Sequence, residues 1–252
     1  MIEVNNIKKR FDDQEVLKGL TTSFQDGKCN LLIGASGAGK TVFLKCLVGL
    51  FTPEEGEILY DGRRLNNMGK REKKELRKEM GMLFQGNALF DSMTVAENIR
   101  FPLDMFTEQS MEEKMDRVNF CLKRVKLENA HNKYPGKISG GMMKRVGIAR
   151  AIVMSPKYLF CDEPNSGLDP QTALLIDELI MELTQEYNMT TVINTHDMNS
   201  VMAIGDKVTF LSQGLLHWEG TKNEIMTSDN QQLSDFIFAS DFLKQLRDMA
   251  LR

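Results

Sequence analysis

A glycine-rich segment between an apolar strand and an apolar helix constrains the fold of this chain more than any other feature. The strand is the run Leu31–Ile33, and after the segment apolar residues recur at helical spacing (Val42, Leu44, Leu47 and Leu50). The segment itself consists of Gly34, Ala35, Ser36, Gly37, Ala38, Gly39, Lys40 and Thr41. Its order matches the pattern GxxxxGK[ST], which predicts a phosphate-binding loop.

The residue types of this loop suit a phosphate group and a divalent cation. Glycines allow backbone N–H groups to turn inward around phosphate oxygens. The N-terminus of the following helix adds about half a positive charge, and Lys40 adds a whole one. The hydroxyl of Thr41 is a hard oxygen ligand that suits Mg²⁺. The alternative is a glycine-rich turn that only connects a strand to a helix.

Length and charge exclude several classes of protein. The chain has 252 residues, of which 42% are apolar and 27% charged, and this composition argues against a disordered chain. The 32 Lys and Arg against 35 Asp and Glu give a net charge of −3, and no strongly basic stretch dominates. A nucleic-acid-binding protein normally shows a basic face, so no nucleic-acid partner is expected. One large α/β domain with an appendage fits the length.

The sequence predicts a soluble, cytoplasmic protein. No apolar run reaches the roughly 18–20 residues that cross a bilayer, and residues 1–5 lack the basic and apolar regions of a signal peptide. The three histidines are too far apart in sequence for a local zinc motif. The cysteines are scattered, which favours reduced thiols in the core over two disulfides (Cys29, Cys46, Cys121 and Cys161).

Strand and helix patterns alternate along the chain. Ile2, Val4 and Ile7 indicate a half-buried strand at the start. Further strands are expected at 57–60, 81–84, 158–161 and 190–194. Helices are expected near 70–79 and after the capping-box patterns Thr94–Glu97 and Ser110–Glu113. This alternation predicts a parallel sheet with crossover helices.

The end of the chain has the pattern of an amphipathic helix. From Ser234 on, apolar residues recur every three or four positions (Phe236, Ile237, Phe242, Leu243, Leu246 and Met249). Such a helix packs on its own domain or contacts another subunit, and the sequence leaves both open.

Two adjacent acids follow the buried strand expected at 158–161. Ligands of parallel sheets bind at the carboxyl ends of the strands, so Asp162 and Glu163 should face the same crevice as Lys40. Asp162 would then hold Mg²⁺, and Glu163 would orient or deprotonate an attacking water. The alternative is a solvated pair at a helix cap.

A second helix start also suits an anion. Ser139, Gly140 and Gly141 come directly before an apolar helical pattern, so their N–H groups and the helix dipole would attract phosphate. An ordinary helix cap explains the same residues equally well. The chain would carry two phosphate-binding helix starts but only one lysine loop, which suggests that two copies share two nucleotides.

Two polar residues, Gln85 and His196, follow other expected strands. Each residue could have a structural or a functional role, and its position alone does not decide between the two.

The order of these motifs resembles that of the ATPase subunits of ABC transporters over nearly the whole chain. Six motifs carry the resemblance: the Walker A loop (Gly34–Thr41), the Q-loop (Gln85), the signature motif (Ser139–Gly141), Walker B (Tyr158–Glu163), the D-loop (Ser166–Asp169) and the switch histidine (His196). The resemblance implies a P-loop NTPase (RecA-like) α/β core with an inserted α-helical subdomain, an antiparallel β edge and a C-terminal amphipathic helix. The ATPase domain would span 1–228, with the helical subdomain at about 86–156, and 229–252 would form the extension.

The resemblance further implies a head-to-tail homodimer that holds two ATP molecules with Mg²⁺ between its protomers. Each protomer would contact one ATP through its own Walker A residues, and its Thr41, Gln85 and Asp162 would hold the metal. Ser139, Gly140 and Gly141 would contact the nucleotide of the partner chain.

The catalytic group implied by the family consists of Glu163 as the base together with His196 and Gln85. Asp169 would link the two sites of the dimer. Phe11 lies where the family has an aromatic residue that stacks on adenine, although a place in the core would suit it equally.

Within the family, the sequence is similar to the Mla/Mkl subgroup. Met142 stands where most members have Gln, and the stretches 83–91 and 101–103 also resemble this subgroup. Its ATPases drive phospholipid transport at the cytoplasmic face of the inner membrane. The implied partners are an integral membrane permease, a single-span MCE protein and a small STAS-type accessory subunit. The alternatives are an ATPase of a polar-solute (amino acid) importer and a non-transport ATPase that acts on DNA or ribosomes.

Overall fold

A computed structural model describes residues 1–238 of the chain. These residues form two compact units. The first unit comprises residues 1–25, 29–67 and those from 194 onward, and the second comprises residues 26–28 and 68–193. The domain boundary expected at residue 228 stays a prediction.

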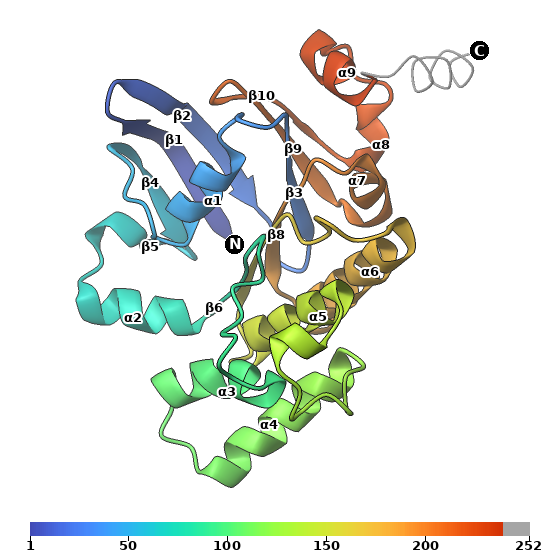
Figure 1. Ribbon diagram of the computed structural model, residues 1–252. Coiled ribbons are helices and arrows are strands. Elements are labelled where there is room, and N and C mark those ends of the chain that lie inside the picture. The colour runs from blue at the N-terminus through green and yellow to red at the C-terminus, as the bar shows by residue number, and fades with distance from the viewer. Residues whose placement is uncertain (239–252) are drawn as a thin grey trace. The chain divides into compact units, whose positions relative to one another are not determined.

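The first unit contains an antiparallel sheet (Figure 1), which confirms the β edge expected from the sequence. Its strands, in spatial order, are β2 (Gln14–Phe24), β1 (Ile2–Phe11), β4 (Glu55–Tyr60) and β5 (Arg63–Arg64). Ile2, Val4 and Ile7 are all fully buried. Strict alternation would turn Ile7 to the opposite face from Val4. A bulge between them, with Asn6 at φ 52°, restores the buried side.

The remaining strands of the first unit lead to the glycine-rich segment. β3 (Cys29–Ile33) pairs in parallel with β9 (Lys207–Ser212), which pairs antiparallel with β10 (Leu215–Gly220). The glycine-rich segment follows β3 and leads into α1 (Lys40–Leu47). The prediction that Leu50 belongs to the buried helix face is wrong. α1 ends at Leu47, Gly49 has φ 69°, and the Leu50 side chain is 55% exposed.

Three short helices follow in the last part of the first unit: α7 (Met198–Ile204), α8 (Lys222–Ile225) and α9 (Gln231–Ile237). α9 packs on its own unit, because Leu233 is fully buried and the ring of Phe236 lies 5.3 Å from that of Phe210. It begins at Gln231, upstream of the expected start. The expected helical residues Phe242, Leu243, Leu246 and Met249 lie outside the described part of the chain.

The second unit contains the other expected strands. In spatial order these are β8 (Thr190–Asn194), β7 (Tyr158–Asp162) and β6 (Met80–Leu83), of which β6 and β7 run parallel. Its helices are α2 (Lys70–Lys78), α3 (Val95–Phe106), α4 (Met111–Arg124), α5 (Gly140–Ile152) and α6 (Pro170–Glu186). Short 3₁₀ turns lie at Leu65–Asn67, in the first unit, and at Pro135–Lys137.

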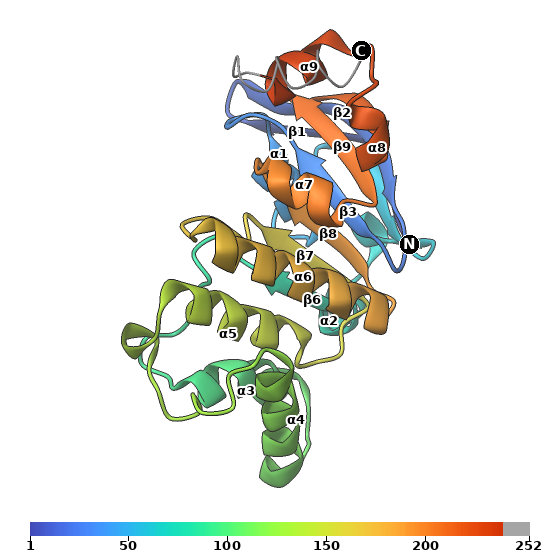
Figure 2. The same cartoon turned by 90° about the vertical axis from the view of Figure 1, so that its right-hand side faces the viewer.

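Helix α5 lies between α6 on one side and the α3–α4 pair on the other (Figures 1 and 2). Two glycines let it approach β6 closely. A Cβ at Gly147 would lie 2.6 Å from Cδ1 of Leu83, and a Cβ at Gly81 would lie 2.3 Å from the carbonyl oxygen of Ala151. Side chains at these positions would push helix and strand apart, so the glycines fix where α5 meets the sheet.

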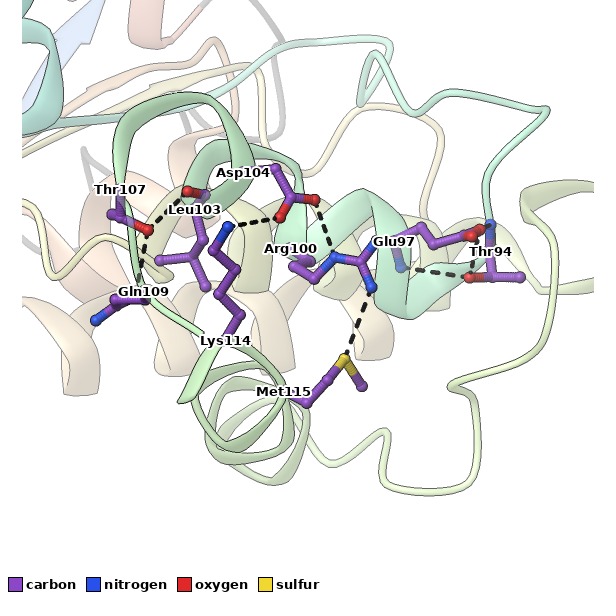
Figure 3. Close-up of polar contacts among 9 residues, drawn as sticks. All are labelled: Thr94, Glu97, Arg100, Leu103, Asp104, Thr107, Gln109, Lys114 and Met115. Carbon is purple, nitrogen blue, oxygen red and sulfur yellow. Dashed lines mark hydrogen bonds and ion pairs between the residues drawn. The ribbon is translucent and has the colours of Figure 1, made fainter. Parts of the chain in front are cut away.

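Helices α3 and α4 begin as the capping boxes predict. Thr94 and Ser110 each accept a hydrogen bond from the backbone three residues on, and Glu97 and Glu113 accept one in return. Figure 3 shows how Asp104 connects the two helices. Its carboxylate accepts from Arg100 Nε at 2.9 Å and from Lys114 Nζ at 3.1 Å.

The cysteines are buried free thiols, as the sequence predicts, at positions 29, 46, 121 and 161. Burial raises the pKa of Cys46 to about 12 and that of Cys121 to about 11, so both thiols stay protonated. Among residues 1–238, no helix combines the length and apolar character that a bilayer span requires.

Candidate functional site

The glycine-rich segment folds around the ammonium group of Lys40. Lys40 Nζ donates to the carbonyl oxygens of Gly34 at 2.6 Å and Ala35 at 3.0 Å, and the side chain is buried. Gly34 and Gly39 adopt φ of 150° and 102°, in the region that favours glycine. A Cβ on Gly34 would lie 2.1 Å from the carbonyl oxygen of Leu211, so only glycine fits there.

The loop has the features that an anion requires. Gly37 has φ 80° and open space where a side chain would begin, so its backbone is accessible. A glycine-rich backbone, a helix start and a lysine ammonium meet here. The residues present therefore fit a phosphate group, and a plain connecting turn would not need the buried lysine.

The turn between β9 and β10 hydrogen-bonds to the glycine-rich loop and stabilises its backbone. The Gly214 N–H donates to the carbonyl of Ala38 at 3.2 Å, and the Gly214 carbonyl accepts from the Lys18 N–H at 2.9 Å. A Cβ on Gly214 would lie 2.2 Å from the carbonyl oxygen of Val16. The loop is thus part of a backbone network rather than a free surface turn.

Thr41 meets the end of β8. The side-chain amide of Asn194 donates to the Thr41 hydroxyl at 3.2 Å, and the Thr195 N–H donates to the carbonyl of Leu32 at 3.1 Å. His196 follows directly and is exposed, whereas Asn194 and Thr195 are buried. His196 is therefore solvent-exposed at the end of a buried strand. No sequence motif indicated a role for Asn194, although it precedes His196 by only two residues.

Phe11 is a surface residue and not part of the core. It is 39% exposed, and its ring packs edge-to-face against Phe51 with centroids 5.2 Å apart. Lys9 Nζ lies 5.1 Å from the ring centroid. The exposed ring of Phe11, which Phe51 holds in place, can stack on a planar ligand.

In the second unit, β7 ends on the two acids that the sequence predicts. Asp162 is buried at the end of the strand, and Glu163 is half-buried with φ 50°. The left-handed conformation is strained for a residue with a side chain, and such strain concentrates at functional sites. The Glu163 carbonyl accepts from the Ser166 N–H at 3.2 Å, which closes a tight turn after the strand.

Lys144, which no sequence motif indicated, connects the segments that follow β6 and β7. Lys144 Nζ, from α5, donates to the Gln85 carbonyl at 2.8 Å and lies 3.4 Å from the Glu163 carbonyl oxygen. Burial lowers the pKa of Lys144, while Cys161, Glu163 and Asp162 oppose that shift. The side chain of Gln85 is exposed.

The backbone after Gln85 also accepts a hydrogen bond from a side chain of α5. Asn87 and Ala88 have φ of 61° and 47°, and the Arg150 guanidinium donates to the Ala88 carbonyl at 2.7 Å. Without side-chain donors the carbonyls of such an irregular segment would lack partners. Charged residues inside an apolar helical pattern are the sequence signal that could have identified Lys144 and Arg150.

The start of α5 lies beside the start of α6. Ser139 caps α5 by accepting from the Met142 N–H at 3.3 Å, and a Cβ on Gly141 would lie 2.7 Å from Cγ2 of Thr172. The Thr172 hydroxyl donates to Asp169 at 2.6 Å, and this contact is the main cause that lowers the pKa of Asp169. Ser139, Gly140 and Asp169 are all exposed.

The structure thus brings the expected residues together in two groups. Within the first unit, the glycine-rich loop and Thr41 lie beside the strand end that precedes His196. Within the second unit, Lys144 connects Gln85 to the turn after Asp162, and Thr172 connects Gly141 to Asp169.

A comparison with protein-family models matches residues 17–166 to the family described as ABC transporter. The chain belongs to this ABC transporter family. The match begins in β2 and includes the loop around Lys40, Gln85, the Ser139 helix start and both strand-end acids. The family binds ATP with Mg²⁺.

The relatives of this chain include two kinds of ABC transporter protein. The chain is 39% identical, over 94% of its length, to "probable ribonucleotide transport ATP-binding protein mkl" of Mycobacterium tuberculosis. It spans 66% of the length of this relative. It is also 34% identical, over 97% of its length and 78% of the relative, to the methionine import ATP-binding protein MetN of Campylobacter jejuni.

Solved structures of the family share the fold. A dimeric bacterial ABC transporter cassette is 31% identical with a TM-score of 0.81, covering 88% of this chain and 99% of that one. A post-hydrolysis dimer bound to ADP and Pi matches at 30% identity with the same TM-score and covers 88% of this chain and 99% of that one. cbiO1 from Clostridium perfringens, part of the transporter complex cbiONQ, is 27% identical with a TM-score of 0.84 and covers 100% and 98%. The P-loop NTPase fold expected from the sequence is confirmed.

Proposed function

We propose that this chain is the ATP-hydrolysing subunit of an ABC transporter. The observation that carries the proposal is the loop around Lys40, because a buried ammonium enclosed by glycine-rich backbone at a helix start suits the phosphates of ATP. Because the ABC transporter family binds ATP, we propose ATP as the nucleotide that this loop binds. The product would be ADP and phosphate, with hydrolysis coupled to transport.

In this proposal the first unit binds the nucleotide. The loop Gly34–Gly39 donates backbone N–H groups to the phosphates, and Lys40 neutralises their charge. Phe11 offers its exposed face to the adenine ring, and Thr41 provides an oxygen ligand for Mg²⁺. His196 hydrogen-bonds the terminal phosphate.

The second unit contributes the groups that act on water and metal. Glu163 accepts a proton from the attacking water, while Asp162 and the Gln85 side chain are ligands of the metal. Bound Mg²⁺ would supply charge neutralisation of the phosphate oxygens. The tight turn after β7 and the left-handed φ of 50° constrain the backbone that carries the Glu163 carboxylate.

We infer that two copies of the chain act as a head-to-tail homodimer. Ser139, Gly140 and Gly141 then face the nucleotide of the partner chain, and Asp169 links the two sites. The exposure of Ser139 and Asp169 at neighbouring helix starts supports this, because both remain accessible to a second copy. Closure on ATP and reopening after hydrolysis would drive the transporter.

The cargo we propose is a phospholipid. The support is the resemblance to the Mla/Mkl subgroup at Met142 and residues 83–91. The mkl relatives, at 39% identity, are themselves named for ribonucleotide transport. The partners would be an integral membrane permease, a single-span MCE protein and a small STAS-type subunit. The chain would lie peripherally on the cytoplasmic face of the inner membrane.

A polar-solute importer is the second candidate, because methionine import proteins are 34–37% identical to this chain. Tagging the chain in its native cell, extracting membranes with mild detergent and identifying copurifying proteins and lipids would distinguish the candidates. A multi-span permease, an MCE protein and enriched phospholipid are expected. A solute-binding protein without lipid enrichment would favour the importer, and recovery only with ribosomes or DNA would overturn the transporter function.

A further inference from the structure

Lys144 is a buried cation with three separate polar contacts in the second unit. Its side chain is 3% exposed. Its ammonium lies 2.8 Å from the Gln85 carbonyl oxygen, 3.4 Å from the Glu163 carbonyl oxygen and 3.5 Å from the Ser166 hydroxyl. An ammonium has three N–H donors, which is the number of oxygens around it.

These three contacts lie at different parts of the proposed site. Gln85 follows β6, Glu163 follows β7, and Ser166 lies three residues further along the turn. Lys144 itself belongs to α5, five residues after Ser139. One side chain therefore connects the helix that begins at Ser139 to both strand ends.

Helix packing alone does not require a charge at this position. Burying an ammonium group is costly unless hydrogen bonds compensate, and an apolar residue could fill the same space without that cost. The close approach of α5 to β6 is already set by Gly147 and Gly81. What Lys144 adds is a set of directional hydrogen bonds to the backbone that follows the two strands.

We propose that Lys144 is a positioning residue for ATP hydrolysis, which holds the backbone of Gln85 and Glu163 in register with the start of α5. It acts through those two residues and does not itself touch the nucleotide. The inference rests on the roles proposed above for Gln85 and Glu163. Beyond those roles, we infer that Gln85, Glu163 and the start of α5 at Ser139 move together as one rigid body.

The expected kinetic effect follows from geometry. Misplacing a reacting group by about 1 Å can lower a rate by about 100-fold. Lys144→Met fills a similar volume but donates no hydrogen bond, so we expect kcat to fall by about 10- to 100-fold. The KM for ATP should change by less than about threefold, because the loop that binds the phosphates belongs to the first unit. The Mg²⁺ concentration for half-maximal hydrolysis should rise, because Gln85 loses its support.

The matched control is Arg145→Met, which removes a cation from the next residue of the same helix. Arg145 donates to the carbonyls of Val125 and Lys126, both at 3.4 Å, and to neither strand end. We expect this variant to keep its kcat. Lys144→Arg retains the charge and the donors, so it should recover most of the rate lost in Lys144→Met.

The experiment measures steady-state ATP hydrolysis of the purified chain over ranges of ATP and Mg²⁺, with circular dichroism melting of each variant. Glu163→Gln is included as a test of the proposed site itself. If it retains turnover, the roles of the site residues fail. If it is inactive while Lys144→Met has a normal kcat, only the inference about Lys144 fails. A rise in the KM for ATP together with a loss of thermal stability in Lys144→Met, or a Lys144→Arg variant as slow as Lys144→Met, would also overturn it.

Discussion

The side-chain amide of Asn194 donates a hydrogen bond to the hydroxyl of Thr41 at 3.2 Å. This contact joins the last residue of β8 to the second residue of α1. It occupies one lone pair of the Thr41 oxygen and so limits the orientations open to the hydroxyl. If Thr41 is a metal ligand, Asn194 orients it, in the way that outer hydrogen bonds commonly orient the ligands of a metal.

Replacing Asn194 with Ala should therefore weaken the use of Mg²⁺. We expect the Mg²⁺ concentration for half-maximal ATP hydrolysis to rise by about 10-fold, the lower end of what loss of such an outer contact costs. Titrating Mg²⁺ at saturating ATP measures this. Asn98→Ala is the control, because Asn98 is equally buried and donates to the carbonyls of Phe90, Met93 and Thr94. An equal rise in both variants would mean that lost stability, not the contact with Thr41, causes the effect.

Replacing Glu163 with Gln should separate binding from hydrolysis. The amide keeps the shape of the carboxylate but cannot accept the proton of water, so turnover should fall by about 10²- to 10⁴-fold. ATP binding should persist, and the variant should accumulate as a closed dimer in ATP. Size-exclusion chromatography with and without ATP, next to a hydrolysis assay, measures both. Near-normal turnover would exclude Glu163 as the base.

The fold class and the location of two glycine motifs at helix starts could be predicted from the sequence, whereas strand register and one helix end could not. Motifs such as Gly34–Thr41 and Ser139–Gly141 are local, because phosphate recognition needs a fixed spacing of glycines and donors, and both lie at helix starts as expected. The bulge at Asn6 was not predicted, because register depends on the neighbouring strands. The helix pattern through Leu50 failed because Gly49 ends α1.

The supporting residues of the site were hidden for a different reason. Lys144 and Asn194 contact residues 19 to 153 positions away, and Thr172 lies against Gly141 of a neighbouring helix. A charge inside an apolar helical pattern can mark a residue such as Lys144, but no local pattern identifies its partners. Phe11 illustrates the limit further. Its apolar character suits the core and a stacking surface equally, and only its exposure in the folded chain decides between them.

Replacing Gln85 with Ala should uncouple hydrolysis from transport. The exposed Gln85 side chain follows β6 at the start of the segment that leads to α3, where nucleotide and permease could be connected. ATP binding should change little, because the loop around Lys40 is intact. Transport by the reconstituted complex should fall more than ATP hydrolysis does. Unchanged transport would contradict this role.

Replacing Ser139 with Ala should impair hydrolysis although Ser139 lies far in sequence from the lysine loop. The change also removes the cap of α5, which costs about 0.5–2 kcal/mol of stability. Ser110→Ala controls for that cost, because Ser110 caps α4 by accepting from Glu113 N–H at 3.2 Å, much as Ser139 accepts from Met142 at 3.3 Å. Both variants should lose similar stability, and only Ser139→Ala should lose activity. Full activity of either a monomer in ATP or the Ser139 variant would refute the shared site.

The contact of Asp104 with Arg100 and Lys114 predicts a pH-dependent contribution to stability (Figure 3). Partial burial disfavours the charged carboxylate, but the two hydrogen bonds outweigh it and hold the pKa of Asp104 below its ordinary value. A carboxyl group with a lowered folded-state pKa stabilises the fold above its unfolded pKa of about 3.9. That stabilisation is lost as the pH falls through the lower folded-state pKa.

Replacing Asp104 with Asn should therefore lower the melting temperature at pH 7 and have a shrinking effect below about pH 4. Since the side chain is 37% exposed, solvent screening limits the cost to about 0.5 kcal/mol. For a chain of this size that corresponds to about 1–2 °C. Glu108→Gln removes a charge from the exposed turn between the same helices and should have no such effect. Melting curves of the three proteins from pH 7 to pH 3 decide the matter, because a constant difference for Asp104→Asn would show that its charge is not what stabilises the helix pair.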